Sequence, residues 1–313
     1  MKQKIIIDTD PGQDDAVAIL LALASPEELD VLAIVCVAGN VPLAQNSTNA
    51  RKIVELSGRL DIPIYAGCVR PMRRSLVTAE HVHGKTGLDG PTLPEPKIEL
   101  RQQHGVDFLI ATLRAAEPRT ITLCTLGPLT NVAMALVTAP EIASRVRAIV
   151  MMGGAYFEVG NITPSAEFNV YVDPEAADVV LRSGIPITMV PLDASHGVLS
   201  TRARLDRIGA LGNRCGKAVV KLLNFSERFD LAKYGSKGAP LHDPCVIAYL
   251  LQPDLFEGRQ INVTVETHSE LTMGMTVADY WQITDRPRNV HYLRSADADR
   301  FFDLLTRRLA RLP

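Results

Sequence analysis

Four aspartates lie within eight residues near the start of the chain, at positions 8, 10, 14 and 15. Asp8 and Asp10 follow a run of isoleucines, and a Pro-Gly pair separates them from Asp14 and Asp15. This spacing predicts a buried strand, a tight turn and a helix that begins with the second pair. Carboxylates this close repel one another unless some are protonated or a cation offsets their charge. Because all these ligands are hard oxygens, the cluster favours Mg²⁺, Ca²⁺ or Mn²⁺ over Zn²⁺. For Asp14 and Asp15, a simple preference for a helix N-terminus is the alternative.

A second group of polar residues lies in the segment 160–169, between two apolar stretches. It contains the amides of Asn161 and Asn169 and the carboxylate of Glu167. Such groups suit bidentate hydrogen bonding to sugar hydroxyls. The alternative is that the two asparagines only form turns, as asparagine often does.

An adjacent His–Asp pair, His242 and Asp243, immediately precedes Pro244. Histidine and aspartate together can supply a proton donor and a metal ligand. The same pattern also fits an ordinary helix start, with Asp243 as N-cap and proline in the first helical position. The local pattern leaves both interpretations open.

The elements that must position these groups alternate between short apolar runs and helix-length patterns, which predicts an α/β fold with an open, mostly parallel sheet covered by helices on both faces. Ligands of such sheets bind at the carboxyl ends of the strands. The segment 70–99, rich in glycine and proline, fits neither pattern and is predicted to form a wall or lid of the site. We see no linker, so residues 1–313 are predicted to form a single domain. The predicted strands are residues 4–8, 32–37, 120–125, 148–152, 187–190, 261–265 and 290–293. The predicted helices are residues 14–24, 43–57, 106–116, 129–137, 174–182, 216–233, 244–251 and 296–310.

Composition excludes several classes of protein. The formal net charge is −2, with 33 basic and 35 acidic side chains, so neither a nucleic-acid surface nor a membrane surface is indicated. No apolar run approaches the length of about 20 residues that a membrane helix needs. The five cysteines are scattered without metal-binding spacing, which is typical of small buried side chains in a reducing compartment. We therefore expect a cytoplasmic protein.

Together these segments resemble the inosine-uridine nucleoside hydrolase family, also called nucleoside N-ribohydrolases. The aspartate run resembles the family signature, and further matches follow in family order over most of the chain. These matches are Asp8-Thr9-Asp10-Pro11-Gly12-Gln13-Asp14-Asp15-Ala16, Ala38-Gly39-Asn40, His83-Gly84, Gly127-Pro128-Leu129-Thr130-Asn131, Met151-Met152-Gly153-Gly154, Glu167-Phe168-Asn169 and His242-Asp243. The resemblance implies the nucleoside hydrolase fold, which is Rossmann-like, and a homo-oligomer, either a dimer or a tetramer.

The resemblance also implies a site for Ca²⁺ and for a nucleoside. The Ca²⁺ ligands would be Asp10, Asp15, the backbone carbonyl of Leu126, and Asp243. The ribose would contact Asp14, Asn40, Met152, Asn161, Glu167 and Asn169, together with Asp243. The base would contact His83, Phe168, Ser226, Asp230 and Tyr234.

The implied reaction is hydrolysis of the N-glycosidic bond of ribonucleosides to base and ribose, in nucleoside salvage. Asp10 would activate a water bound to the metal, and carboxylates would stabilise the positive charge that develops on the ribose. His242 is the family's candidate for protonating a departing purine, and His83 is a second candidate. Uridine and cytidine are the expected substrates, with inosine as a further one. In relatives that favour pyrimidines, the helix at 216–233 carries hydroxyl and amide groups, and the acidic Asp230 departs from that pattern.

Two other functions fit parts of the sequence. An Asp-x-Asp phosphatase would use Asp8 as nucleophile, Asp10 as acid and Mg²⁺ as metal, but it leaves Glu167 and His242 unexplained. A non-catalytic module that binds nucleosides with the help of Ca²⁺ would use the same residues for affinity alone.

Overall fold

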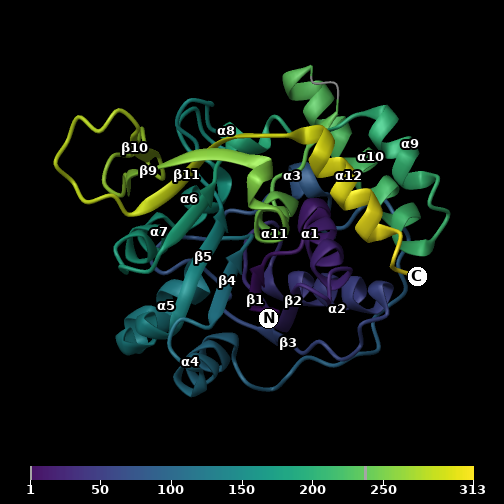
Figure 1. Ribbon diagram of the computed structural model, residues 1–313, viewed down its shortest axis with the longest axis horizontal. Coiled ribbons are helices and arrows are strands. Elements are labelled where there is room, and N and C mark those ends of the chain that lie inside the picture. Colours follow the sequence, from purple (N-terminus) through teal and green to yellow (C-terminus); the bar gives the residue numbers. More distant parts are fainter. Residues whose placement is uncertain (1, 236–237) are drawn as a thin grey trace.

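The computed structural model describes residues 2–235 and 238–313. Nine strands of these residues form one sheet, in the order β10-β9-β11-β6-β5-β4-β1-β2-β3. The seven strands from β11 to β3 in this order pair with one another in parallel. At one edge, β9 pairs antiparallel with both β11 and β10. The mostly parallel sheet with helices on both faces is the fold class predicted from the sequence (Figure 1).

The strands of the large sheet are β1 (Gln3–Thr9), β2 (Leu29–Cys36), β3 (Ile64–Ala66), β4 (Ile121–Thr125), β5 (Val146–Met152), β6 (Ile187–Val190), β9 (Phe256–Val265), β10 (Thr276–Asp279) and β11 (Val290–Ala296). Two short strands, β7 (Leu199–Ser200) and β8 (Ala239–Pro240), pair separately. The helices are α1 (Gln13–Leu23), α2 (Leu43–Ser57), α3 (Glu80–His83), α4 (Gly105–Ala115), α5 (Thr130–Thr138), α6 (Phe168–Val172), α7 (Pro174–Leu181), α8 (Leu192–Ser195), α9 (Arg202–Gly209), α10 (Arg214–Tyr234), α11 (Pro244–Leu251) and α12 (Ala298–Leu309). Two 3-10 helices, Pro140–Arg145 and Pro253–Leu255, connect them.

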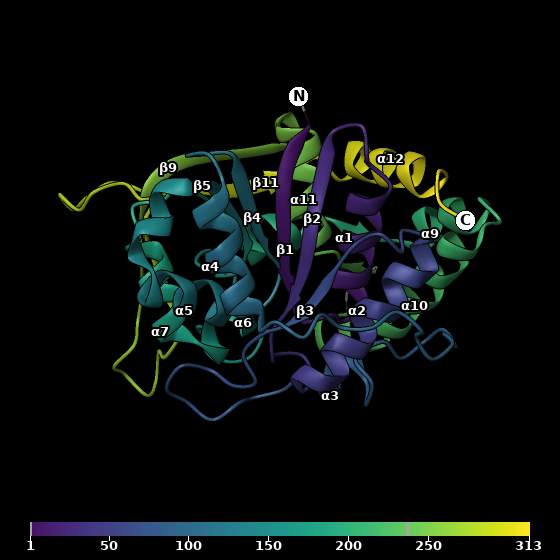
Figure 2. The same cartoon turned by 90° about the horizontal axis from the view of Figure 1, so that it is seen from below.

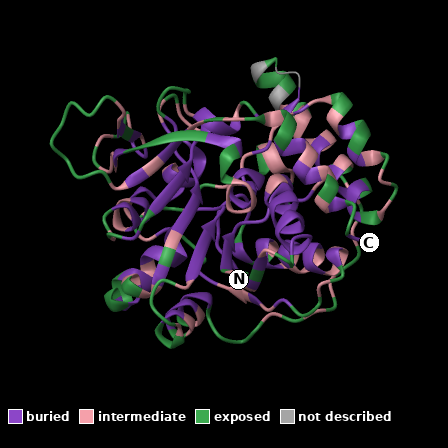
Figure 3. Ribbon diagram, in the orientation of Figure 1, coloured by how far each residue is buried: buried purple, intermediate pink, exposed green. Residues whose placement is uncertain are grey.

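Side chains of β1 alternate between two hydrophobic clusters, one on each face of the sheet. Ile5 and Ile7 pack with α1, α2, α10, α11 and α12, whereas Ile6 packs with α4, α5 and α7. Figure 2 shows these two sets of helices on opposite sides of the sheet. The central strands are buried between them (Figure 3). A continuous run of apolar residues is what a strand covered on both faces requires.

The sequence predicted every long strand and helix, with boundaries that differ by a few residues. It missed β3, β10, the β7–β8 pair and the short helices α3, α6 and α8, because two to five residues are too few to establish a period. It also missed α9, which is two turns long. The segment 70–99 contains α3 and is otherwise irregular. None of the described helices combines the length and the apolar character that a membrane span needs.

The strand order reverses between β1 and β4. The chain proceeds from β1 outward to β3 on one side, and then returns to β4 and continues outward to β6 on the other. Loops at the carboxyl ends of β1 and β4 therefore diverge and leave a crevice, which is where ligands bind in doubly wound sheets. Asp10 follows β1, and Leu126 follows β4.

One buried side chain, Asn131 of α5, joins the strand ends on this edge. Its Nδ2 donates to Asp8 Oδ2 at 2.8 Å and to the Cys36 carbonyl at 3.1 Å, while its Oδ1 accepts from the backbone N–H of Cys68 at 2.7 Å. Burial raises the pKa of Asp8 to about 7, and the bond from Asn131 opposes the rise. Asp8 is therefore a structural carboxyl that depends on this amide.

Replacing Asn131 by Ala should lower the free energy of unfolding by about 2 kcal/mol or more, because it leaves buried polar partners of the amide unpaired. Denaturant unfolding monitored by circular dichroism measures the loss. The matched control is Asn224→Ala, at a half-buried position of α10, with an expected change of about 0.5 kcal/mol or less. Equal losses in the two variants would contradict the structural role of Asn131.

Candidate active site

A pocket of about 910 Å³, part of it open to solvent, lies at the carboxyl ends of the strands. Its wall combines acidic and amide side chains with apolar and histidine side chains. Most of the residues predicted from the sequence line it: Asp14, Asn40, His83, Leu126, Met152, Asn161, Glu167, Phe168, Asn169, Ser226, His242 and Asp243. A concave site with a few convergent polar groups is typical of small-ligand binding.

Asp10 and Asp15 are completely buried behind this wall. Asp10 Oδ2 accepts from the backbone N–H of Asn40 at 2.7 Å, and Asn40 Nδ2 donates to the Asp10 carbonyl at 3.0 Å. Asp15 Oδ1 accepts from the Thr9 hydroxyl at 2.5 Å, and its Oδ2 accepts from the backbone N–H of Gly12 at 2.9 Å. Asp15 thus secures the first turn of α1 and is at the same time part of the acidic cluster.

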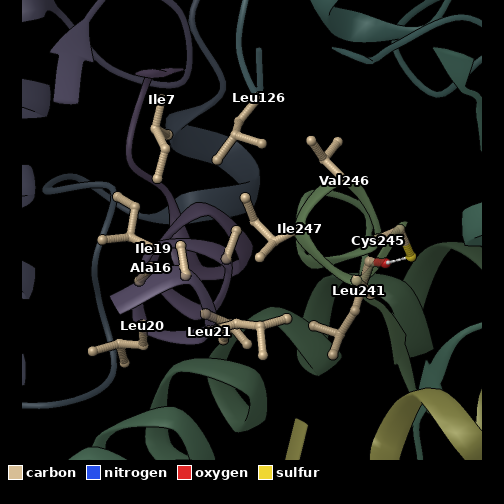
Figure 4. Close-up of a cluster of buried hydrophobic side chains, with 14 of the residues drawn as sticks. Ile7, Ala16, Ile19, Leu20, Leu21, Leu126, Leu241, Cys245, Val246 and Ile247 are labelled. Carbon is tan, nitrogen blue, oxygen red and sulfur yellow. Dashed lines mark hydrogen bonds between the residues drawn. The ribbon is translucent and has the colours of Figure 1, made fainter. Parts of the chain in front are cut away.

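Asp243 occupies the N-cap position of α11, but its side chain makes no capping hydrogen bond. Its carboxyl instead shares a hydrogen bond with Asp15. The packing of α1 against α11 brings Asp15 and Asp243 together. Leu21 of α1 and Ile247 of α11 belong to the hydrophobic core where the two helices pack (Figure 4). The ordinary N-cap interpretation of Asp243 is therefore wrong for its side chain.

The carboxylates of this cluster raise one another's pKa values. Burial, and then repulsion from Asp15, raise the pKa of Asp10 well above its usual range. Burial and repulsion from Asp14 likewise raise the pKa of Asp15, and burial followed by repulsion from Asp14 raises that of Asp243 well above normal. For Asp14 burial raises the pKa, and nearby backbone N–H groups oppose the rise. Such a cluster needs protons or a cation for electrical balance.

The cluster has the donors that a hard cation prefers. Ligand oxygens of Asp14, Asp15 and Asp243 all lie within 4.8 Å of one another. Oδ1 of Asp10 is buried without a hydrogen-bond partner, and Leu126 lines the pocket. Of the predicted metal ligands Asp10, Asp15, Leu126 and Asp243, the structure groups Asp15 and Asp243 with Asp14, whereas Asp10 lies outside this group. An all-oxygen set of this kind suits Ca²⁺ or Mg²⁺ rather than Zn²⁺.

Two glycines are required beside Asp10. A Cβ atom on Gly39 or on Gly127 would collide with the Asp10 carboxylate. The turns after β2 and β4 can therefore approach this carboxylate only because they carry glycine at these positions. This explains physically why glycine occurs in the motifs Ala38-Gly39-Asn40 and Gly127-Pro128.

Another part of the pocket wall is built around Glu167, the N-cap of α6. Its carboxylate accepts from the backbone N–H groups of Gly154, Asn169 and Val170 at 3.0, 2.9 and 3.3 Å. Burial raises its pKa to about 7, and these three bonds oppose the rise. Asn169 Nδ2 donates to the Leu126 carbonyl at 2.6 Å and lies 3.3 Å from the sulfur of Met152. These groups are therefore held in fixed orientations.

Asn161 makes a turn and faces the pocket as well. Its Oδ1 accepts from the backbone N–H of Phe168 at 2.8 Å, and Lys233 of α10 donates to its carbonyl at 2.7 Å. Asn161 therefore shapes the loop, as the turn interpretation predicted, and it also lines the pocket; hydrogen bonding to sugar hydroxyls stays a prediction.

Two histidines of the pocket, His83 and His242, are electrically neutral near pH 7. Burial lowers the pKa of His83 to about 4, and burial, with repulsion from other histidines, lowers that of His242 to about 3. His83 Nδ1 lies 2.6 Å from Gln13 Oε1, and His242 Nδ1 lies 2.8 Å from the Ser195 hydroxyl. Each ring then carries one proton, so each can donate a hydrogen bond without bearing charge.

The segment 70–99 forms part of the wall, as predicted, through Ala79, His81, Val82 and His83. The site residues predicted one by one did not include Ile162, His196, Leu223, Phe229 and Pro240, which also line the pocket. Most of these are apolar and carry no chemical signature, and Leu223 and Phe229 come to the site on α10, which packs against α3. His196 could have been noticed, since it lies just beyond the end of the predicted strand 187–190. Ser226 lines the pocket as predicted, whereas the side chains of Asp230 and Tyr234 lie outside the described residues.

Comparison with known proteins matches this geometry to one family. The family model described as "Inosine-uridine preferring nucleoside hydrolase" matches residues 5–303. The chain belongs to this family. The sequence predicted a hydrolase that acts on N-glycosyl bonds. This enzyme class is confirmed, because it is the class of the family and of the relatives. The phosphatase alternative is not supported, and Asp8, its proposed nucleophile, is bonded to Asn131 away from the pocket wall.

Individual relatives span the whole chain. An uncharacterized protein of Schizosaccharomyces pombe is 54% identical over 99% of this chain and 100% of its own. A pyrimidine-specific ribonucleoside hydrolase of Photobacterium profundum is 47% identical over 99% of both chains. Among solved structures, a plant nucleoside hydrolase superposes with a TM-score of 0.92 at 34% identity, over 99% of both chains.

Gly127→Ala should destabilise this nucleoside hydrolase by about 1–3 kcal/mol, because the added methyl group must displace the Asp10 carboxylate or the β4 turn. Thermal unfolding measures the effect. The matched control is Gly209→Ala in α9, where the nearest atom to the new methyl would be Val220 Cγ2 at 3.7 Å. This variant should be unchanged or slightly stabilised, since alanine favours the helix. If the stability of Gly127→Ala were unchanged, the turn after β4 would be able to move enough to accommodate the methyl group.

Proposed function

We propose that the protein is a Ca²⁺-dependent ribonucleoside hydrolase, which converts pyrimidine ribonucleosides, and inosine more slowly, to free base and ribose. The observation that carries this proposal is the acidic cluster at the switch point, which borders a pocket with fixed amide donors and acceptors. The preference for pyrimidines rests on a relative that is 47% identical and is described as pyrimidine-specific. A role in nucleoside salvage, a cytoplasmic location and a homodimeric or homotetrameric assembly complete the proposal.

Ribose binding is assigned to the polar side of the pocket. Asp14, Asn161, Glu167 and Asn169 would hold the ribose hydroxyls, with Asn40 and Met152 beside the sugar. Glu167 is suited to this task because three backbone N–H groups already orient its carboxylate. Such preorganisation means that little reorganisation is needed when substrate binds.

The chemical step follows from charge. Breaking the N-glycosidic bond develops positive charge on the ribose, and the surrounding carboxylates stabilise that charge as it forms. Asp10 takes a proton from the attacking water, and its unpartnered Oδ1 is the oxygen proposed for this task. When bound by Asp10, Asp15, Asp243 and the Leu126 carbonyl, Ca²⁺ would offset the carboxylate repulsion and lower the pKa of the water.

On the other side of the pocket, Phe168, Ser226, His83 and His242 are proposed to contact the base. His242 Nδ1 lies 2.8 Å from the Ser195 hydroxyl, and the other ring nitrogen, Nε2, is the one proposed to hydrogen-bond the base. Asp230 and Tyr234 are proposed as further base contacts from the sequence pattern alone.

Turnover tests the proposal directly. Release of reducing sugar from uridine, cytidine and inosine should be observed, should stop on chelation, and should be fastest with a pyrimidine nucleoside. Asp10→Asn should lower kcat about 100-fold or more, because an amide cannot accept the proton. Asp30→Asn, at an exposed position of β2, is the matched control with unchanged kcat. An Asp10→Asn variant with near-normal kcat would refute the role of Asp10. Binding without turnover in the wild type would favour the non-catalytic alternative.

The affinity for Ca²⁺ should increase between pH 5.5 and pH 7.5, by about tenfold or more. Burial and mutual repulsion raise the pKa values of Asp10, Asp14, Asp15 and Asp243, so these groups hold protons that Ca²⁺ must displace at lower pH. For the same reason the chelated protein should lose stability as pH rises through this range, since the folded state binds more protons than the unfolded state. Titration calorimetry and thermal unfolding measure both effects. An affinity that is independent of pH would contradict this assignment of the cluster.

A further inference from the structure

A third histidine of the pocket wall, His196, differs from His83 and His242 in its surroundings. It follows the short helix α8, lines the pocket, and its ring centroid lies 5.7 Å from that of His242. Its side chain is 27% exposed, so one part of it reaches water while another faces the site. His196 Nδ1 lies 3.4 Å from Oε2 of Glu158, whose side chain is 44% exposed.

The backbone of Glu158 is held by α8, the helix that His196 follows. Asp193, in α8, accepts from the backbone N–H groups of Tyr156, Phe157 and Glu158 at 3.0, 2.7 and 3.1 Å. Asp193 is in turn held by the Tyr292 hydroxyl at 2.8 Å. Asp193 therefore joins the loop after β5 to the helix after β6, and this connection brings the backbone of Glu158 close to His196.

The reaction needs a group of this kind on the base side of the pocket. When the glycosidic bond breaks, its electron pair remains on the base, so the departing base requires a proton or a nearby positive charge. The polar side of the pocket supplies carboxylates and amides, which serve the ribose. The carboxylate of Glu158 lies beside Nδ1 of His196, and both side chains are partly exposed to water. The ring of His242 lies beside that of His196 as well.

We propose that His196, paired with Glu158, is the proton donor to the departing base. This inference rests on the proposed hydrolase function and assigns its leaving-group step. The bond between C1′ of the ribose and the base nitrogen breaks, and the base receives its electron pair and a proton from His196. Because Nδ1 contacts Glu158, Nε2 is assigned to this transfer. Water supplies the hydroxyl group at C1′, its other proton passes to Asp10, and His196 regains a proton from solvent, so that one water is consumed for each base and ribose released.

Two substrates that differ in the leaving group test this role. Uridine loses a poor leaving group, whereas 4-nitrophenyl β-D-ribofuranoside releases a nitrophenolate that needs no proton. His196→Gln should lower kcat for uridine about 100-fold, and lower kcat for the nitrophenyl riboside by less than about threefold. Glu158→Gln, which keeps the size of the side chain, should lower the uridine rate by about threefold to tenfold, with the same selectivity between substrates.

A matched control is available in the chain. His268 lies 3.8 Å from Glu266 and its side chain is 93% exposed, so His268→Gln removes a histidine beside a glutamate without touching the pocket. It should match the wild type on both substrates. Thermal unfolding of all variants establishes that the comparison is made between folded proteins.

Two results would overturn the proposal: an equal loss of rate on both substrates in His196→Gln, which indicates a structural role, or an unchanged rate on both. Failure of the proposed hydrolase function is recognised separately, because the wild type would then release ribose from neither substrate. Loss of both activities in Asp10→Asn, alongside the selective loss in His196→Gln, would place the two residues on the water side and the base side of the same reaction.

Discussion

The mutual repulsion of buried carboxylates is the interaction on which this structure depends. Asp10 and Asp15 are fully buried, Asp243 is nearly so, and Asp14 is close by. In a low-dielectric interior their charges oppose folding unless each has a donor or a compensating cation. The protein supplies the donors from backbone groups and small side chains: the N–H groups of Asn40 and Gly12 and the hydroxyl of Thr9. These donors leave part of the carboxylate charge uncompensated, and we propose that this remaining charge binds the metal and serves catalysis.

The fold accommodates this concentration of charge because several well-packed elements hold the aspartates in place. The aspartates follow the central strand β1, whose isoleucines are buried on both faces of the sheet. The packing of α1 against α11 fixes the distance between Asp15 and Asp243 (Figure 4). Glycines at positions 39 and 127 allow two neighbouring turns to approach Asp10. Strain or mobility in any of these elements would separate the oxygens that must act together.

The groups proposed to bind the ribose and the base are held in different ways. The carboxylates and amides proposed for the ribose, such as Glu167 and Asn169, are held by multiple hydrogen bonds, which gives fixed geometry. The histidines of the pocket have different surroundings: His242 is half-buried and neutral, whereas His196 lies beside a carboxylate and is partly exposed to water. In the proposed reaction, anionic groups act where positive charge develops, and His196 acts where the base departs.

The sequence by itself determined the parts of this protein that depend on local pattern. Apolar runs and helical periods gave the long strands and helices, and the strand–helix alternation gave the parallel sheet with its ligand edge at the carboxyl ends. Dense motifs such as the aspartate run, the segment from Asn161 to Asn169 and the His242–Asp243 pair identified most of the polar pocket wall, because chemically unusual residues in close spacing are visible without a fold.

Only the tertiary structure decided which of two uses a side chain serves and which distant residues meet. Asp243 could have capped its own helix, and its bond to Asp15 exists only because α1 and α11 pack together. Asp8 and Asp10 look equivalent in the sequence, yet Asn131 binds the first and the Asn40 backbone binds the second. The pairing of His196 with Glu158 requires a loop and a helix 38 residues apart to be joined by Asp193. Such contacts depend on long-range packing, which has no local period for a sequence pattern to reveal.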